Sequence, residues 1–130
     1  MVFGVGIDLI EVPRIARQIE AGKRFTDRIF TDREAAYCEG KKNKAQNYAA
    51  RFAAKEAFLK ATGVGWRKGL TFKDIEVLND PLGKPELVLH GKAREFVEEN
   101  GISNIQLTLT HLKETAGAVV VLEKYVPSGV

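Results

Sequence analysis

The sequence predicts an α+β fold: a single domain in which a mostly antiparallel sheet packs against one long helix and several short ones. Its 130 residues match the usual size of one domain. Helical spacing and strand-like alternation of apolar residues both occur, but without the regular β-α-β order of a parallel sheet. Turn-rich segments join neighbouring strand patterns, which favours hairpins and therefore antiparallel pairing.

The first half of the chain is expected to form one strand followed by three helices. Residues 2–7 are an apolar run typical of a short buried strand that ends at Asp8. Apolar residues at helical spacing then predict helices over residues 12–22, 32–39 and about 44–62. Thr31 begins the capping box of the second helix, and Gly63 is the expected C-cap of the third.

The second half is expected to hold most of the sheet. Strands are predicted over residues 74–78, 86–90, 105–110 and 116–122, and a short helix over 92–99. The segment 105–110 alternates apolar and polar residues, whereas 116–122 is almost continuously apolar and is expected to be a central strand. The Pro, Ser and Gly residues of 126–130 are typical of a loose tail.

Positive charge is concentrated in the first half of the chain. The formal net charge is +3, but residues 1–70 hold 14 Lys and Arg against 8 Asp and Glu, while residues 71–130 hold 6 against 9. The isoelectric point is near 9.0. This distribution indicates an anionic ligand or an acidic partner.

Several classes of protein are excluded by composition. The apolar start lacks a basic segment and ends at Asp8, which predicts neither a signal peptide nor a membrane span. The single cysteine, Cys38, cannot form an internal disulfide, and His90 and His111 are too far apart for a usual zinc site. We therefore expect a cytoplasmic protein that does not enter a membrane.

Glu56 occupies an unusual position on the long helix. A helical wheel places an apolar stripe on one side, formed by Ala45, Ala49, Phe52 and Leu59, and places Asn47, Arg51 and Lys55 on the outer side. Glu56 lies near the middle of the stripe, with Lys60 four residues later. A buried carboxylate must be paired, protonated or bound to a cation. The alternative is an ordinary helical salt bridge between Glu56 and Lys60.

Asp8 is the second candidate, because acidic residues directly after a buried strand often lie where ligands bind. Asp8 and Glu56 together would suit Mg²⁺, which takes one or two carboxylates, waters and phosphate oxygens. Lys60 would then neutralise a phosphate or protonate a leaving group. The alternatives are a helix-capping role for Asp8 and a structural role for His111, which ends an alternating strand and could point inward.

Three motifs stand out together: GID at 6–8, FAAKEAFLK at 52–60 and LTLTH at 107–111. They resemble the motifs of the holo-acyl-carrier-protein synthase family of short phosphopantetheinyl transferases, and Gly83-Lys84-Pro85 is similar to a turn of the same family. Their order and spacing match the family over essentially the whole chain. The family usually carries serines in the last motif, where this chain has Thr108 and Thr110.

The resemblance implies transfer of 4′-phosphopantetheine from coenzyme A to a serine of apo acyl carrier protein, in support of fatty acid biosynthesis. It implies that Asp8 and Glu56 hold Mg²⁺, and that Lys60 stabilises or protonates the departing 3′,5′-ADP. Glu56 would help to deprotonate the serine, although Asp8 and water also remain candidates for the base. Residues expected around the nucleotide are Lys60, Gly63, Gly83, Pro85 and His111.

The resemblance also implies partners. Arg14, Arg17, Arg24 and Phe25 would bind the acidic carrier protein, whereas residue chemistry without the resemblance favours a solvated helix face. The family further implies a homotrimer with its sites at subunit interfaces. Only Phe58, which the wheel places on the outer side of the long helix, suggests such a contact here.

Two other functions fit parts of the sequence. A nucleic-acid-binding domain would explain the basic half and the lysines at 41–44, but not Glu56 on an apolar stripe, and no aromatic platform accompanies the lysines. A noncatalytic interaction module could use the Arg14 helix, but it would need neither Asp8 nor Lys60. The enzyme is preferred, with no nucleic acid among its partners.

Overall fold

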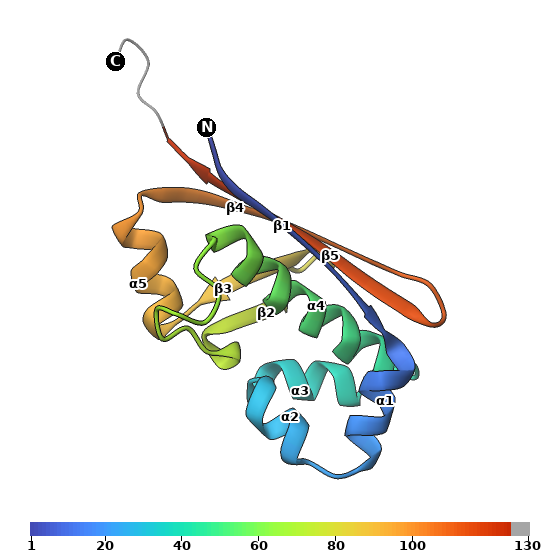
Figure 1. The fold of residues 1–130 in the computed structure, drawn as a ribbon. Coiled ribbons are helices and arrows are strands. Elements are labelled where there is room, and N and C mark those ends of the chain that lie inside the picture. Colours follow the sequence, from blue (N-terminus) through green and yellow to red (C-terminus); the bar gives the residue numbers. More distant parts are fainter. Residues whose placement is uncertain (126–130) are drawn as a thin grey trace.

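The computed structural model describes residues 1–125 and confirms the α+β class (Figure 1). Three antiparallel strands form one sheet in the order β1-β5-β4, with bounds β1 (Val2–Glu11), β4 (Ile102–His111) and β5 (Thr115–Lys124). A separate hairpin contains β2 (Ile75–Asn79) and β3 (Pro85–Leu89). The position of β5 between two neighbours confirms that it is a central strand. The predicted tail at 126–130 lies outside the described residues.

Five α-helices and one short 3-10 helix complete the described chain. They are α1 (Val12–Glu20), α2 (Arg24–Ile29), α3 (Asp32–Glu39), α4 (Lys44–Thr62), η1 (Phe72–Asp74) and α5 (Gly91–Glu99). Figure 1 shows α1, α2 and α3 gathered at one end of α4, with α5 and the β2–β3 hairpin toward the other. Within residues 1–125, none of the helices combines the length and apolar character that crossing a bilayer requires.

The first strand differs from the sequence prediction in both length and burial. It continues past Asp8 to Glu11, because its pairing with β5 extends through Glu11 opposite Thr115. Asp8 therefore lies inside the strand, opposite Ala118, and not after its end. The strand is also not buried on both faces: its outward side chains are exposed, namely Val2, Val5, Ile7 and Leu9.

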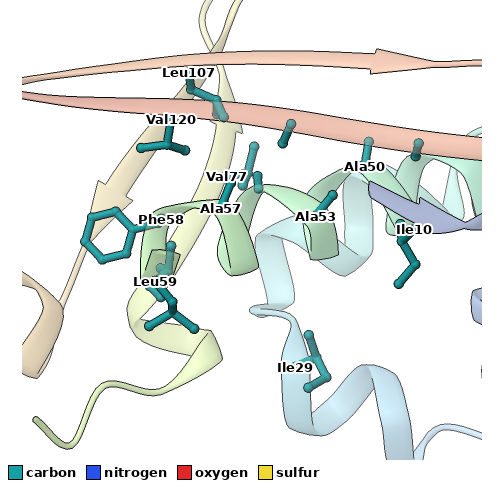
Figure 2. Close-up of a cluster of buried hydrophobic side chains, with 14 of the residues drawn as sticks. Ile10, Ile29, Ala50, Ala53, Ala57, Phe58, Leu59, Val77, Leu107 and Val120 are labelled. Atoms are coloured by element: carbon teal, nitrogen blue, oxygen red, sulfur yellow. The ribbon is translucent and has the colours of Figure 1, made fainter. Parts of the chain in front are cut away.

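Small residues allow α4 to lie directly against the three-stranded sheet. The buried alanines of α4 are Ala49, Ala50, Ala53, Ala54, Ala57 and Ala61. Figure 2 shows Ala50, Ala53 and Ala57 among the core side chains. Glycines of β1 complete this close contact: a Cβ at Gly6 would lie 1.8 Å from the Ala57 carbonyl oxygen, and one at Gly4 would lie 1.9 Å from that of Ala61. Strand and helix backbones thus touch without intervening side chains.

The predicted outer side of α4 is buried as well. Arg51, Lys55 and Phe58 are at most 3% exposed, contrary to the helical-wheel assignment. The reason is that α4 contacts the sheet on one side and also packs against α3 and β2. Phe58 is therefore a core residue of the single chain and does not support a contact between subunits.

Candidate active site

Asp8 and Lys60 meet where β1 crosses α4. Side chains alternate along a strand, so Asp8 shares the inward face with Gly4 and Gly6. The ammonium of Lys60 donates hydrogen bonds to Asp8 Oδ1 and to the Ile7 carbonyl oxygen, both at 3.0 Å. The Asp8 side chain is 15% exposed and that of Lys60 is 55% exposed, so this ion pair faces solvent. The close approach at the two glycines is what brings the pair together.

Glu56 lies one helical turn before Lys60 and is half-buried. Burial raises the pKa of its carboxyl group, the negative charge of Asp8 raises the pKa further, and the positive charge of Lys60 opposes the shift. Within residues 1–125, the ion pair of Lys60 is with Asp8, so the alternative of a Glu56–Lys60 salt bridge is wrong. The structure therefore brings Asp8, Glu56 and Lys60 into one cluster, as the sequence predicted.

The donor atoms of this cluster fit a magnesium ion. Two carboxylates in mutual repulsion gain from a cation between them, and the effect of Asp8 on the Glu56 pKa reflects that repulsion. In the part of the chain that the structure describes, no three Asp, Glu, His or Cys residues gather at one point. Two hard oxygen donors, with waters and phosphate oxygens in the remaining positions, are the usual protein environment of Mg²⁺.

A separate pocket contains three of the predicted nucleotide-binding residues. Gly83, Pro85 and His111 line a cavity of about 240 Å³ together with the first half of α4. Its other lining residues are Tyr37, Gln46, Asn47, Ala50, Arg51, Asn79, Thr108 and Leu109. His111 is exposed at the end of β4, not turned into the core. Lys60 and Gly63 are not part of this pocket.

Arg51 is a functional candidate that the sequence analysis missed. Its side chain is buried in the pocket wall, where a guanidinium nitrogen donates to Asn79 Oδ1 at 2.6 Å and the group lies 4.1 Å from the centre of the Tyr37 ring. Among residues 1–125, its Nε has no hydrogen-bond partner. A buried cation with a free donor suits an anionic ligand. No local pattern could reveal this, since Asn79 lies 28 residues away.

Gly63 ends α4 in the left-handed conformation, with φ of 78°, which confirms it as the C-cap. Its amide donates to the Lys60 carbonyl oxygen at 3.2 Å, and its own carbonyl accepts from Arg67 at 3.1 Å. These hydrogen bonds fix the turn that begins three residues after Lys60. Gly63 thus lies next to the Asp8–Lys60 cluster along the chain, but apart from the pocket.

The predicted carrier-binding residues lie on α1 and α2. Arg14 and Arg17 are exposed on α1. Arg24 and Phe25 line a cavity of about 310 Å³, together with Arg28 and the end of α1. The arginines of α1 and α2 are thus exposed, while Phe25 is half-buried and packs against Phe30 and Phe52. That combination suits an acidic partner that also presents an apolar side chain.

Comparison with known proteins extends the resemblance over nearly the whole chain. Residues 4–119 match the model of the 4′-phosphopantetheinyl transferase superfamily. A holo-[acyl-carrier-protein] synthase of Geobacter sulfurreducens is 50% identical over 125 residues, covering 95% of this chain and 99% of that one. One from Solibacter usitatus is 52% identical over 124 residues, covering 95% and 99%. The chain belongs to the holo-[acyl-carrier-protein] synthase family.

Solved structures of holo-[acyl-carrier-protein] synthases share the fold. One from Neisseria meningitidis superposes with a TM-score of 0.88 at 38% identity, covering 95% of this chain and all of that one. One from Bacillus anthracis, in complex with CoA (3′,5′-ADP), has a TM-score of 0.80 at 39% identity, covering 96% and 99%. The chain is thus an enzyme of this family. The nucleic-acid-binding domain and the noncatalytic module are set aside in its favour.

Proposed function

We propose that the chain transfers 4′-phosphopantetheine from coenzyme A to a serine of apo acyl carrier protein, releasing 3′,5′-ADP. The observation that carries this proposal is the Asp8–Lys60 ion pair with Glu56 one turn away, at the junction of β1 and α4. Two carboxylates and an ammonium in one place suit a reaction at a pyrophosphate. Transfer to the carrier would support fatty acid biosynthesis in the cytoplasm.

The reaction needs positioning and charge neutralisation more than a covalent intermediate. The serine oxygen attacks the phosphorus that bears pantetheine, and the anhydride bond to the second phosphorus breaks. The serine loses its proton, and the departing 3′,5′-ADP gains the negative charge. No activated cysteine or serine of this chain is required, because phosphoryl transfer proceeds by direct displacement.

Asp8 and Glu56 would hold Mg²⁺ against the pyrophosphate. When bound, the metal neutralises phosphate charge and orients the two phosphates. Glu56 also has the properties of a base, since its pKa is raised by burial and by the neighbouring Asp8 charge. Asp8 and a water molecule are the other candidates for accepting the serine proton.

Lys60 would stabilise the leaving group. Its ammonium lies 3.0 Å from Asp8 Oδ1 and is more than half exposed, so it can turn toward a bound phosphate without unfolding its surroundings. As a general acid, the Lys60 ammonium would donate the proton that 3′,5′-ADP takes up at its new terminal oxygen. Gly63 would lie beside the same phosphates, one turn after Lys60.

The pocket formed by Gly83, Pro85 and His111 would hold the nucleotide, with Arg51 as an additional anion-binding group. It is separate from the cluster: Ala50 in the pocket and Lys60 are ten residues apart on one helix, or about 15 Å along its axis. One way to complete the site is to combine the cluster of one protomer with the pocket of its neighbour. We propose a homotrimer with shared sites of this kind.

The outer face of the three-stranded sheet supports this assembly. Val5, Ile7 and Leu9 are 58%, 59% and 68% exposed on β1, and Val119 and Val121 of β5 lie directly beside them. Adjacent exposed apolar side chains mark an interaction surface more strongly than scattered ones. This face would form the centre of the trimer. The proposal of three subunits rests on the family resemblance, whereas the exposed apolar residues indicate which surface the subunits would share.

The basic surface of α1 and α2 would bind the carrier protein. Arg14, Arg17 and Arg24 would attract its acidic surface, and Phe25 would contact an apolar side chain. The proposed transfer is tested by incubating the enzyme with coenzyme A, Mg²⁺ and apo carrier protein. Equal amounts of 3′,5′-ADP and modified carrier are expected. Release of 3′,5′-ADP without a change in carrier mass would indicate hydrolysis and overturn the proposal.

A further inference from the structure

Lys55, the residue before Glu56, is enclosed in the interior with a charged partner. Its side chain and that of Glu34 on α3 are both 0% exposed, and Lys55 Nζ lies 2.8 Å from Glu34 Oε1. The ammonium also donates to the carbonyl oxygens of Phe72 at 2.9 Å and Ile75 at 2.6 Å. All three of its protons are therefore used.

The carboxylate of Glu34 also has hydrogen-bond partners for both of its oxygens. It accepts from Lys55, from the Thr31 amide at 3.0 Å and from the Val77 amide at 2.8 Å. The Thr31 contact belongs to the capping box that begins α3. The pair thus joins α4 to the start of α3, to the start of η1 and to β2.

The net stability gained from such a pair is small. Desolvating two charges costs about as much as their attraction returns, so apolar residues of similar volume are often equally stable at such positions. The pair fixes the direction of the Lys55 side chain, because three hydrogen bonds hold its ammonium and two more hold the carboxylate of Glu34.

Other polar contacts of α4 join Tyr48 to Glu39, Arg51 to Asn79 and Lys60 to Asp8, and among these contacts the Lys55–Glu34 pair is the fully buried one next to Glu56. The contact of α4 with the sheet is made by alanines against the backbone of Gly4 and Gly6, so it contains no directional side-chain hydrogen bond. Glu56 and Lys60, by contrast, must point at Asp8 from a helix whose successive side chains are 100° apart. A small rotation about the helix axis would move both charges away from Asp8.

We infer that Lys55, held by Glu34, is a positioning residue that sets the rotation of α4 and thereby aims Glu56 and Lys60 at Asp8. Lys55 does not touch the substrate: its ammonium is saturated inside the protein. This inference rests on the proposed function for its catalytic consequence, but its structural part, the orientation of α4, can be measured without activity.

The test is the double variant Glu34→Gln/Lys55→Met, which removes both charges together and keeps a capping-box side chain at position 34. We expect kcat to fall by about tenfold to 100-fold, as for small displacements of reacting groups, with a much smaller change in the KM for coenzyme A. Residual dipolar couplings of the α4 amides should show the helix rotated relative to β5. Unchanged kcat and unchanged couplings would overturn the inference.

Two further variants separate positioning from general stability. Phe96→Leu removes buried apolar volume at α5, away from α3, and so lowers stability without touching the Glu34–Lys55 pair. It should leave the dipolar couplings of α4 and kcat as in the wild type. A loss of kcat in Phe96→Leu equal to that in the double variant would attribute the effect to stability and overturn the inference. If the double variant does not fold, Glu34→Asp replaces it as the test. This substitution keeps the charge but shortens the side chain that holds Lys55, so kcat should fall. A normal kcat in Glu34→Asp would contradict the inference.

Failure of the proposed function gives a different result. Wild-type enzyme that transfers nothing to any apo carrier would remove the catalytic role. The dipolar couplings of the double variant would still show whether the Glu34–Lys55 pair sets the rotation of α4.

Discussion

At the scale of single residues, the protonation of Glu56 depends on its neighbours. Burial and the Asp8 charge raise its pKa, and Lys60 lowers it. Because holding Mg²⁺ needs the carboxylate, binding of Mg²⁺ to the metal-free protein, followed by calorimetry, should weaken on the acidic side at a pH above the ordinary titration range of a glutamate. The charged form is thus costly in the folded chain without a cation, and this is the state that Mg²⁺ would relieve.

Replacing Asp8 tests this coupling. In Asp8→Asn the repulsion disappears while the Lys60 charge remains, so the Glu56 pKa should fall toward its ordinary value. A titration of the Glu56 side-chain carbon by NMR measures the change directly. Glu98→Gln, which breaks an exposed pair on α5, serves as the control and should leave Glu56 unaffected. An unchanged or higher Glu56 pKa in Asp8→Asn would show that the two carboxylates are not coupled.

The lowered pKa of Glu76 predicts how the free energy of unfolding varies with pH. Burial alone would raise its pKa, but hydrogen bonds from Arg33, Thr31 and His90 outweigh burial and lower the pKa to about 2. Because the folded pKa lies below the unfolded one, the stabilisation is present above the unfolded value and is lost as pH falls toward 2.

Glu76→Gln should accordingly reduce the free energy of unfolding by about 2 kcal/mol at pH 7, a figure lowered for the solvent around the exposed Arg33. The difference from wild type should shrink steadily between pH 4.5 and 2, as followed by urea unfolding. Glu98→Gln, at an exposed ion pair, is the reference and should change stability little. A difference that does not depend on pH would contradict this account.

At the scale of elements, the contact of β1 with α4 decides whether the cluster forms. Gly6→Ala would place a methyl group 1.8 Å from the Ala57 carbonyl oxygen, so the strand must move away from the helix. We expect a loss of about 3 kcal/mol in unfolding free energy and a larger loss of transfer activity, because Asp8 moves with the strand. Thermal unfolding and transfer assays measure the two effects.

A matched glycine provides the comparison. Gly40 caps α3 in the right-handed helical region with φ of −79°, and a Cβ there would have no neighbour closer than 3.7 Å. Gly40→Ala should therefore leave both stability and activity close to wild type. If Gly6→Ala were tolerated equally well, close packing of the two glycines would not be what positions Asp8.

Elements set by local signals were predictable from the sequence, whereas those set by tertiary contacts were not. The capping box of α3 and the glycine C-cap of α4 appear where expected, since each depends on residues a few positions apart. The length of β1 depends on pairing with β5, more than a hundred residues later, and α2 has no strong periodicity of its own. The side of α4 that holds Lys55 was predicted to be exposed but is buried. A helical wheel shows which side chains share a face, but it does not show that other elements cover more than one face of the helix.

The same distinction applies to the candidate site. Asp8, Glu56 and Lys60 could be found because a carboxylate on an apolar helix stripe is unusual, and because the surrounding motifs resemble a family. Arg51 could not, because its role depends on Asn79 and Tyr37 from other elements. The separation between the cluster and the pocket of Gly83 and His111 also became visible only in three dimensions.

At the scale of the whole molecule, the exposed apolar face of the sheet predicts assembly. Ile7→Glu places a charge at the middle of this face and should convert the proposed trimer to monomer, as measured by light scattering after size-exclusion chromatography. Coenzyme A binding should weaken with it, because each site would need two protomers. Ala36→Glu, an exposed position on α3, is the control and should stay trimeric. Wild-type enzyme that is monomeric and fully active would contradict the shared site.

The proposed transfer of phosphopantetheine by the cluster of Asp8, Glu56 and Lys60 changes the mass of the carrier protein, which can be measured. Apo carrier protein is incubated with coenzyme A, Mg²⁺ and wild-type enzyme, Glu56→Gln or the surface control Glu95→Gln. Wild type and the control should add one phosphopantetheine to one serine, while Glu56→Gln should be about 100-fold slower or worse with its thermal unfolding unchanged. No gain in carrier mass with wild type, or near-normal transfer by Glu56→Gln, would contradict the account.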